Sequence, residues 1–173
     1  SVNDIFSFWR EIFFHQTNLQ GGIDFYILNI LKKSEKKMIF EAFGYDISIK
    51  TYKSLTRSFA EIKNKNNKLL ILPYPGKMKR SSWWKNEGFK GLYIISAIPF
   101  INKNQTSPQL VVVSNKKPIL EGDYSFLYIS TKLIREKNLK KINQLKRSYL
   151  YLSKSFLNYD KLEFLGAYPN LKI

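Results

Sequence analysis

The chain has 173 residues and a formal net charge of +16, and its length is enough for one domain with a buried core or one domain plus an appended segment. It has no cysteine and one histidine, His15, which excludes disulfides, thiol nucleophiles and metal sites built from several histidines. No run is apolar enough to span a bilayer and no signal peptide leads the chain, so we expect a cytoplasmic protein without a metal or a cofactor.

The first element that we expect is a helix over Phe6–Gly22, closed by a double glycine. At about 100° per residue, Gln16 and Gln20 fall in line with an apolar stripe that includes Trp9 and Ile12. Two interpretations are open: the amides serve a helix–helix contact, or they point at a polar ligand held between helices. Since the sequence starts with Ser and enters a helix at once, we expect the natural protein to begin further upstream.

The next part of the chain alternates strands and helices. Apolar, β-branched runs predict strands, and amphipathic runs with a cap predict helices. Strands buried on both faces favour parallel pairing in an α/β sheet. The expected elements are a strand at Asp24–Leu31, a helix at Met38–Gly44, a strand at Ile47–Tyr52, a helix at Leu55–Asn64 capped by Ser54, and a strand at Lys68–Pro75.

The second half is richer in strands. A loop over Pro75–Phe89 precedes two strong strands that we expect to form a hairpin. Thr131–Asn143 is basic and amphipathic, which predicts a helix. The expected strands are Gly91–Phe100, Gln109–Ser114, Tyr124–Ser130, Ser148–Leu157 and Lys161–Tyr168.

The basic charge raises the alternative of a nucleic-acid-binding protein. Its densest groups are Lys32–Lys37, Lys77–Arg80 and Lys137–Arg147, and the other basic residues are scattered. The chain is also rich in residues with AT-rich codons, so a biased genome explains the charge without selection for binding. We therefore regard nucleic acid as an unlikely partner.

Two motifs of the first helix carry a resemblance to a known family. Trp9-Arg10-Glu11-Ile12, and Leu19-Gln20-Gly21 running into a strand, resemble the last helix of the type II, all-helical chorismate mutase domain. Gln20 falls on the Gln that is characteristic of that family. Gln16 stands where the family usually has Ser. The resemblance implies that residues 1–22 are the end of a chorismate mutase domain.

The resemblance continues downstream. Residues 23–173 are similar to the catalytic domain of prephenate dehydratases, a periplasmic-binding-protein-like α/β fold, and the whole chain looks like a group of α-proteobacterial chorismate mutases. The resemblance implies an N-terminal helix followed by a mixed sheet with flanking helices. The motifs that carry it, in chain order, are Phe43-Gly44, Ile71-Leu72-Pro73-Tyr74-Pro75, Trp83-Trp84, Ala97-Ile98-Pro99-Phe100 and Leu110-Val111-Val112-Val113.

The residues that the dehydratase reaction needs are missing. Prephenate dehydratases carry a Gly-Pro-x-Gly turn after the first strand, Glu-Asn-Ser after the third, and Thr-Arg-Phe before a later strand. The corresponding places here read Asn29-Ile30-Leu31-Lys32, Tyr74-Pro75-Gly76 and Pro108-Gln109-Leu110. Decarboxylative dehydration needs a donor for the leaving hydroxyl beside a cation for the carboxylates. We therefore expect no dehydratase activity.

The mutase reaction is a pericyclic rearrangement of chorismate to prephenate, which needs no cofactor and no covalent nucleophile. By resemblance, Gln20 would donate a hydrogen bond to the ether oxygen and Gln16 would contact a carboxylate. Arg10 is a further candidate for substrate binding. The family's cationic groups come from two preceding helices that this sequence lacks. The fragment alone is therefore expected to be inactive.

Trp83 and Trp84 lie in the basic loop with Arg80, which suggests either stacking on an aromatic carboxylate effector or packing against the sheet. The leading hypothesis is part of a chorismate mutase, working as a homodimer through its N-terminal helical domain. The alternatives are a ligand-sensing or structural α/β module without catalysis, and a nucleic-acid-binding protein.

Overall fold

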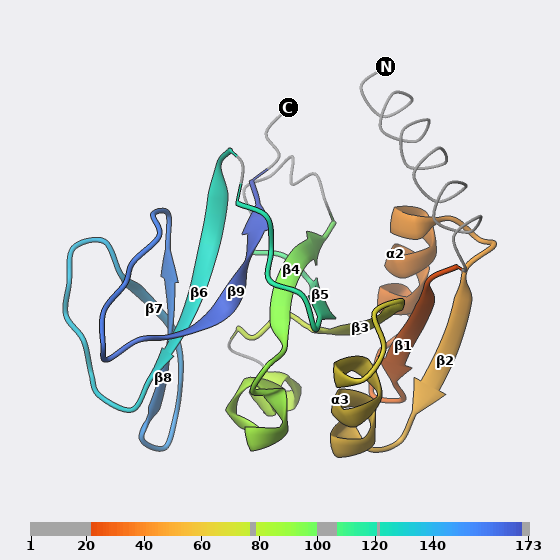
Figure 1. Cartoon of the computed structure of the whole chain (residues 1–173), viewed down its shortest axis with the longest axis horizontal. Helices are drawn as coiled ribbons and strands as arrows, with labels where there is room; N and C mark the ends of the chain where they lie inside the picture. Colours follow the sequence, from red (N-terminus) through yellow and green to blue (C-terminus); the bar gives the residue numbers. More distant parts are fainter. Residues whose placement is uncertain (1–21, 77–78, 100–106, 121, 171–173) are drawn as a thin grey trace.

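The fold is built on one mixed, nine-stranded sheet with the order β2-β1-β3-β5-β4-β9-β6-β8-β7 (Figure 1). The computed structural model describes residues 22–76, 79–99, 107–120 and 122–170, with the backbone alone at 79–81. The helices accompany the first strands of the chain, and the last four strands form the other end of the molecule. We call residues 22–76 the first lobe and residues 124–170 the second lobe.

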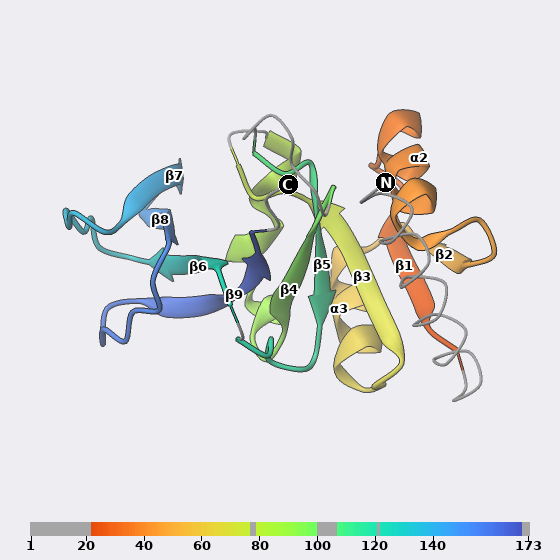
Figure 2. The same ribbon diagram turned by 90° about the horizontal axis from the view of Figure 1, so that it is seen from above.

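The first lobe has the predicted β-α-β-α-β order. Its elements are β1 (Asp24–Leu28), α2 (Lys33–Phe43), β2 (Ser48–Tyr52), α3 (Leu55–Lys63) and β3 (Lys68–Pro73). Strand β1 pairs in parallel with β2 on one side and β3 on the other, which confirms the expected parallel sheet. The two helices cover opposite faces (Figure 2), because the right-handed crossovers from β1 to β2 and from β2 to β3 run in opposite directions across the sheet.

Local capping explains where the helices begin. The Ser54 hydroxyl accepts the Arg57 backbone N–H at 3.4 Å, as predicted for the start of α3. Helix α2 begins at Lys33, five residues before the predicted Met38, so the predicted start was wrong. The cause is Glu35, whose carboxylate accepts the Lys32 backbone N–H at 2.8 Å and thereby satisfies an N-terminal donor.

The middle of the chain joins the lobes. The loop predicted after β3 contains two 3₁₀ helices, η1 (Lys79–Lys85) and η2 (Glu87–Phe89). Strands β4 (Tyr93–Ile98) and β5 (Leu110–Ser114) pair antiparallel, as expected for a hairpin. β5 also pairs with β3, and β4 pairs with β9, so this hairpin connects the first lobe to the second.

The second lobe is an antiparallel β structure in the described residues, and the helix predicted at Thr131–Asn143 is absent. Its strands are β6 (Tyr124–Ser130), β7 (Lys140–Leu145), β8 (Ser148–Ser153) and β9 (Glu163–Pro169). The apolar residues of the supposed helix do not share a face. Ile134 and Leu139 pack on one side of the sheet, whereas Ile142 packs on the other. Alternation within β7 was mistaken for a helical period.

Two loops, and no helix, cover the outer face of this lobe in the described residues, and tyrosine hydroxyls hold these loops in place. The Tyr151 hydroxyl accepts the Ile134 backbone N–H at 2.8 Å. The Tyr128 hydroxyl accepts the Leu157 backbone N–H, also at 2.8 Å. Loops 131–139 and 154–162 are therefore fixed against the outer sheet face by side chains of β8 and β6.

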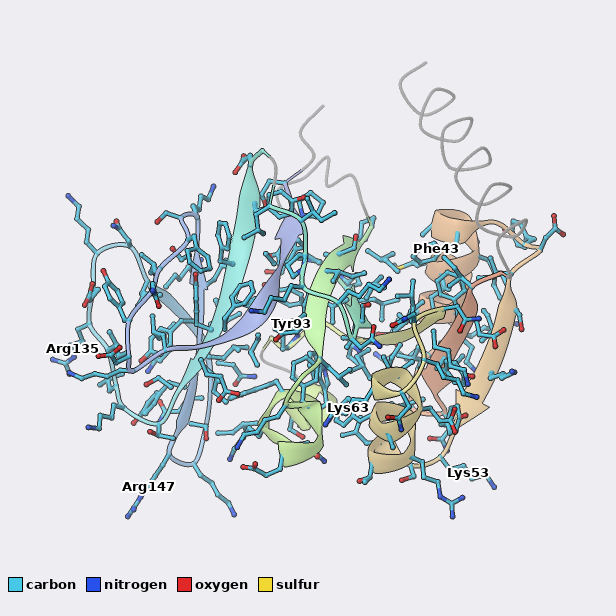
Figure 3. The ribbon with its side chains drawn as sticks, in the orientation of Figure 1. Phe43, Lys53, Lys63, Tyr93, Arg135 and Arg147 are labelled. Carbon is cyan, nitrogen blue, oxygen red and sulfur yellow. The ribbon has the colours of Figure 1, made fainter. Side chains whose placement is uncertain are left out.

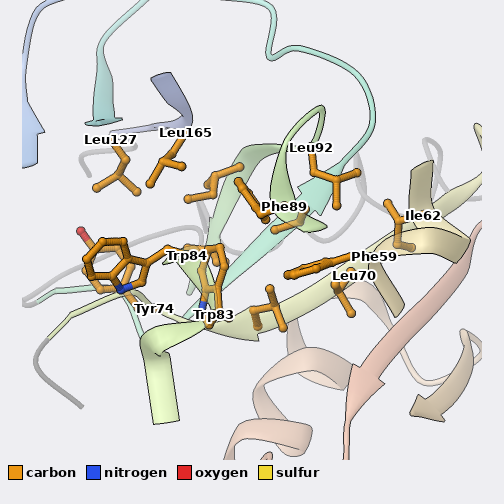
Figure 4. Packing of buried hydrophobic residues seen from close by; sticks show 14 of the residues in the cluster. Phe59, Ile62, Leu70, Tyr74, Trp83, Trp84, Phe89, Leu92, Leu127 and Leu165 are labelled. Atoms are coloured by element: carbon orange, nitrogen blue, oxygen red, sulfur yellow. The ribbon is translucent and has the colours of Figure 1, made fainter. Parts of the chain in front are cut away.

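The largest buried cluster runs along the sheet face that carries α3, η1 and η2, and it extends from the first lobe into the second (Figure 4). It includes Phe59 and Ile62 of α3, both tryptophans of η1, and Leu127 of β6. The opposite face of the first lobe buries α2 in a second cluster. A shared core across the joining hairpin makes the two lobes one packed unit.

Candidate functional site

Strand directions define one edge of the sheet where a ligand site is expected. Strands β1, β2 and β3 are parallel, β4 lies antiparallel to β5, and β9 is parallel to β4. The carboxyl ends of β1, β3, β4 and β9 therefore lie at the same edge, which we call the carboxyl edge. In open α/β sheets, ligands bind outside this edge where the strand order reverses, here between β1 and β3.

A buried pair of tyrosines occupies the carboxyl edge. Tyr74 directly follows β3 and Tyr168 lies near the end of β9, and their hydroxyls are 3.1 Å apart in a shared hydrogen bond. The rings meet edge to face, with centroids 6.0 Å apart at 80°. Burial raises the pKa of Tyr74 far above its ordinary value, and burial also raises the pKa of Tyr168. Both phenols are therefore neutral hydrogen-bonding groups and cannot act as bases.

The hydrogen-bonded network continues from Tyr168 into the second lobe. Ser125 is the cross-strand partner of Tyr168, and its hydroxyl donates to the Asn170 side-chain oxygen at 2.7 Å. The Asn170 amide nitrogen donates in turn to an Asp123 carboxylate oxygen at 3.0 Å. Either phenol can be the donor in the hydrogen bond between Tyr74 and Tyr168.

Both predicted tryptophans are packed into the core beside this network (Figure 4). Trp83 is 3% exposed and its indole N–H donates to the Pro73 carbonyl at 2.8 Å, which ties η1 to the end of β3. Trp84 is 2% exposed, and its indole N–H meets no acceptor among the described residues. A buried donor without a partner costs free energy, so Trp84 is the polar group of this core that calls for an explanation.

Two further contacts fasten the loop after β3 to the second lobe. The Asn143 side-chain amide of β7 donates to the Gly76 carbonyl and, at 3.5 Å, to the Pro75 carbonyl. The Lys85 ammonium donates to the Leu145 carbonyl at 3.0 Å. Strand β7 thus holds both the residues that follow β3 and the end of η1.

The three places that correspond to dehydratase motifs meet at the same edge. Residues 29–32 follow β1, 74–76 follow β3, and 108–110 lead into β5. The Tyr74 backbone N–H donates to the Gln109 carbonyl at 2.9 Å, so two of these segments are in direct contact. The segments carry no arginine, threonine or glutamate at these positions. The three segments therefore lack the arginine, threonine and glutamate of the dehydratase motifs, and Lys32 is the one cation that they carry.

Most of the site residues predicted from sequence lie outside what the structure describes. Gln16, Gln20 and Arg10 precede residue 22, and only the backbone of Arg80 is described. Of the predicted set, only Trp83 and Trp84 are placed, and both are buried. Sequence reasoning missed Tyr168 and Ser125, because nothing in their strands distinguishes them from ordinary alternating residues.

The basic groups are spread over separate surfaces. The group Lys137–Arg147 runs along the edge strand β7 and its turn, and Arg135 and Arg147 point outward there (Figure 3). Lysines on an edge strand protect it from pairing with another chain, which accounts for part of this charge.

In the described part of the chain, no group of three or more His, Cys, Asp and Glu side chains could hold a metal ion. Within that part, no helix is long and apolar enough to cross a membrane.

Comparison with known proteins identifies the fold. No protein-family model matches the sequence, and no curated protein matches it. Among solved structures, the X-ray structure of prephenate dehydratase from Streptococcus mutans matches with a TM-score of 0.52 at 9% identity, covering 87% of this chain and 100% of that chain. The chain has a prephenate dehydratase-like fold. This confirms the predicted periplasmic-binding-protein-like α/β architecture of the described residues.

A second structure shares this architecture. GqqA, described as a novel type of quorum-quenching acylase, matches with a TM-score of 0.55 at 9% identity, covering 86% of this chain and 95% of that chain. Two proteins with different stated activities are thus similar to this chain to the same degree. The prephenate dehydratase-like fold alone does not decide the activity, which has to be argued from the residues at the site.

Proposed function

We propose that this chain is the C-terminal part of a chorismate mutase, and that its prephenate dehydratase-like domain is a non-catalytic module that binds a small molecule or supports the mutase. The proposal joins two arguments. The motifs of residues 1–22 resemble the last mutase helix, and the described domain has the fold that the same resemblance implied.

The observation that supports a non-catalytic module best is the content of the carboxyl edge. Where dehydration of prephenate would need a cation and an acid, the edge holds the neutral Tyr74–Tyr168 pair, which lies in the same buried cluster as Trp84. Neutral phenols supply no positive charge for the two carboxylates of prephenate. The domain is thus suited to packing and to hydrogen bonding, and unsuited to the dehydratase reaction.

The mutase chemistry in this proposal belongs to the helix before the domain. Gln20 would donate to the ether oxygen, where negative charge grows in the transition state, and Gln16 and Arg10 would contact the carboxylates. The remaining cations would come from helices upstream of Ser1, and two copies would assemble into a cytoplasmic homodimer through the helical domain. The loop with Arg80, Trp83 and Trp84 is the proposed place for an aromatic amino acid effector, with the Trp84 N–H as its spare donor.

Mutase turnover of the intact protein tests this proposal. In Gln20→Ala, turnover should fall by about a hundredfold or more, since one preorganised donor to a developing charge is lost. Asn18→Ala is the matched control, because at about 100° per residue the predicted helix would place residue 18 opposite Gln16 and Gln20, and its turnover should not change. Equal turnover in Gln20→Ala and the parent protein would refute the assignment.

A further inference from the structure

A cavity of about 370 Å³ lies in the second lobe where β6 ends and β9 begins, at the edge opposite the carboxyl edge. Its volume is within the range of small-molecule sites. Its floor is a cross-strand pair, Ile129 opposite Glu163, and its walls are the loops that follow β6 and precede β9. The lining residues are Ile129, Ser130, Thr131, Lys132, Asp160, Lys161, Leu162 and Glu163.

The walls of this cavity are held in place by hydrogen bonds. The Tyr151 hydroxyl donates to the Lys132 carbonyl at 3.4 Å, which positions the first wall on β8. The Leu162 backbone N–H donates to the Tyr159 carbonyl at 2.9 Å, which closes the turn of the second wall. Each wall is therefore held by a hydrogen bond of its own.

The lining carries solvent-exposed charges of both signs. Lys132 and Lys161 supply two ammonium groups, and Asp160 and Glu163 supply two carboxylates. None of the four forms an ion pair with another described residue, whereas Lys37, Lys50, Lys68 and Lys90 each pair with a carboxylate. A ligand that carries one positive and one negative group would satisfy charges of both signs at once.

The Ser130 hydroxyl is a hydrogen-bond donor at the floor of the cavity. Ser130 is 4% exposed, and its hydroxyl oxygen accepts the Lys132 backbone N–H at 3.1 Å. No described residue accepts the Ser130 hydroxyl proton, so this proton is available to a ligand oxygen. The side chains of Ile129 and Leu162 supply the apolar part of the lining.

We propose that this cavity binds a small zwitterion, an α-amino acid with an apolar side chain. The Ser130 hydroxyl and the lysines Lys132 and Lys161 receive the carboxylate. Asp160 and Glu163 receive the ammonium group. The apolar side chain lies against Ile129 and Leu162. This proposal is independent of the mutase assignment, because it rests on the second lobe alone.

Calorimetric titration of the whole chain with L-leucine and with L-phenylalanine tests the proposal. Two analogues of leucine each lack one charge: 4-methylpentanoate has no ammonium group, and 3-methylbutylamine has no carboxylate. We expect the amino acids to bind and each analogue to bind at least about tenfold more weakly, since each loses charge-assisted hydrogen bonds.

Variants locate the binding in the cavity. Asp160→Asn and Lys161→Gln should each weaken amino acid binding by about tenfold. Asp46→Asn and Lys137→Gln are exposed controls of the same chemistry outside the cavity, and they should bind like the parent chain. The proposal is overturned if neither amino acid binds, if an analogue binds as tightly as leucine, or if the controls weaken binding as much as the cavity variants. Mutase turnover plays no part in these results, so failure here leaves the mutase assignment standing.

Discussion

Gly166 of β9 lies directly against the backbone of Ile94 of β4, at the single register position where these two parallel strands pair. A Cβ atom built on Gly166 would overlap the Ile94 backbone and lie 2.7 Å from its Cα. Gly166 also has a φ of +137°, a backbone angle that residues with a side chain rarely adopt. The junction between the lobes thus depends on a residue without a side chain.

Replacing Gly166 with alanine should therefore destabilise the protein strongly. We expect a loss of about 3 kcal/mol or more, from backbone strain together with the overlap at Ile94. Urea unfolding followed by tryptophan fluorescence measures this loss. Gly91→Ala is the matched control, since Gly91 has a φ of +83° but open space around its Cβ position, so it should lose only about 1–2 kcal/mol. Equal losses in the two variants would show that the close approach is unimportant.

The Tyr74–Tyr168 pair predicts a non-additive mutant cycle. Tyr168→Phe leaves the Tyr74 hydroxyl without its partner in a buried site, and should cost about 1–3 kcal/mol. Adding Tyr74→Phe to that variant should cost little more, because its hydroxyl is already unpaired. Unfolding free energies of both single variants and the double variant test this. Additive losses would mean that the two hydroxyls do not interact.

The two tryptophans differ in how their indole nitrogens are used. Trp83→Phe removes the hydrogen bond to the Pro73 carbonyl, whereas Trp84→Phe removes an N–H that has no partner among the described residues. Since both replacements lose similar buried volume, Trp83→Phe should be the more destabilising by about 1 kcal/mol. Thermal unfolding compares them. A larger loss in Trp84→Phe would indicate that its N–H has a partner in the protein.

A surface pair on the first lobe predicts a pH dependence. The Lys68 ammonium contacts the Glu61 carboxylate at 2.8 Å and lies over the Tyr26 ring, 4.8 Å from its centroid. The hydrogen bond from Lys68 lowers the pKa of Glu61 below its ordinary value of 4.5. A lowered carboxylate pKa contributes stability above pH 4.5, and that stability disappears as the pH falls through the lowered pKa.

Glu61→Gln should accordingly melt at a lower temperature than the parent protein near pH 7, and the difference should shrink as the pH falls below 4.5 and through the lowered pKa of Glu61. Melting curves across this range measure the difference. Glu41→Gln is the comparison, because its pair with Lys37 is exposed on both sides and should matter less. If the difference in melting temperature persists at acid pH, the ion pair is not its cause.

The first lobe was predictable because its signals are local. Apolar runs between polar turns predicted β1, β2 and β3, and Ser54 predicted the start of α3. The supposed helix over 131–143 shows the limit of such reasoning. Its apolar residues contact two different sheet faces, and tertiary pairing of β7 with β8 overrode the apparent helical period.

The candidate site was less predictable, since it depends on contacts between distant segments. Tyr74 and Tyr168 are 94 residues apart in sequence and meet only because β9 inserts beside β4. The tryptophans were recognised as important, and both alternatives for them, stacking on a ligand and packing on the sheet, were compatible with the pattern. The tryptophans lie in the core because of the order of the strands in the sheet, and no local sequence pattern reveals that order.

The most direct test of the central claim is the product formed when the purified intact protein is incubated with chorismate. Chromatography with ultraviolet detection separates prephenate from phenylpyruvate. We predict that prephenate accumulates and that no phenylpyruvate forms, because our proposal assigns mutase activity to the N-terminal helix and the sequence lacks the dehydratase motifs. Formation of phenylpyruvate, or unchanged chorismate, would contradict this account.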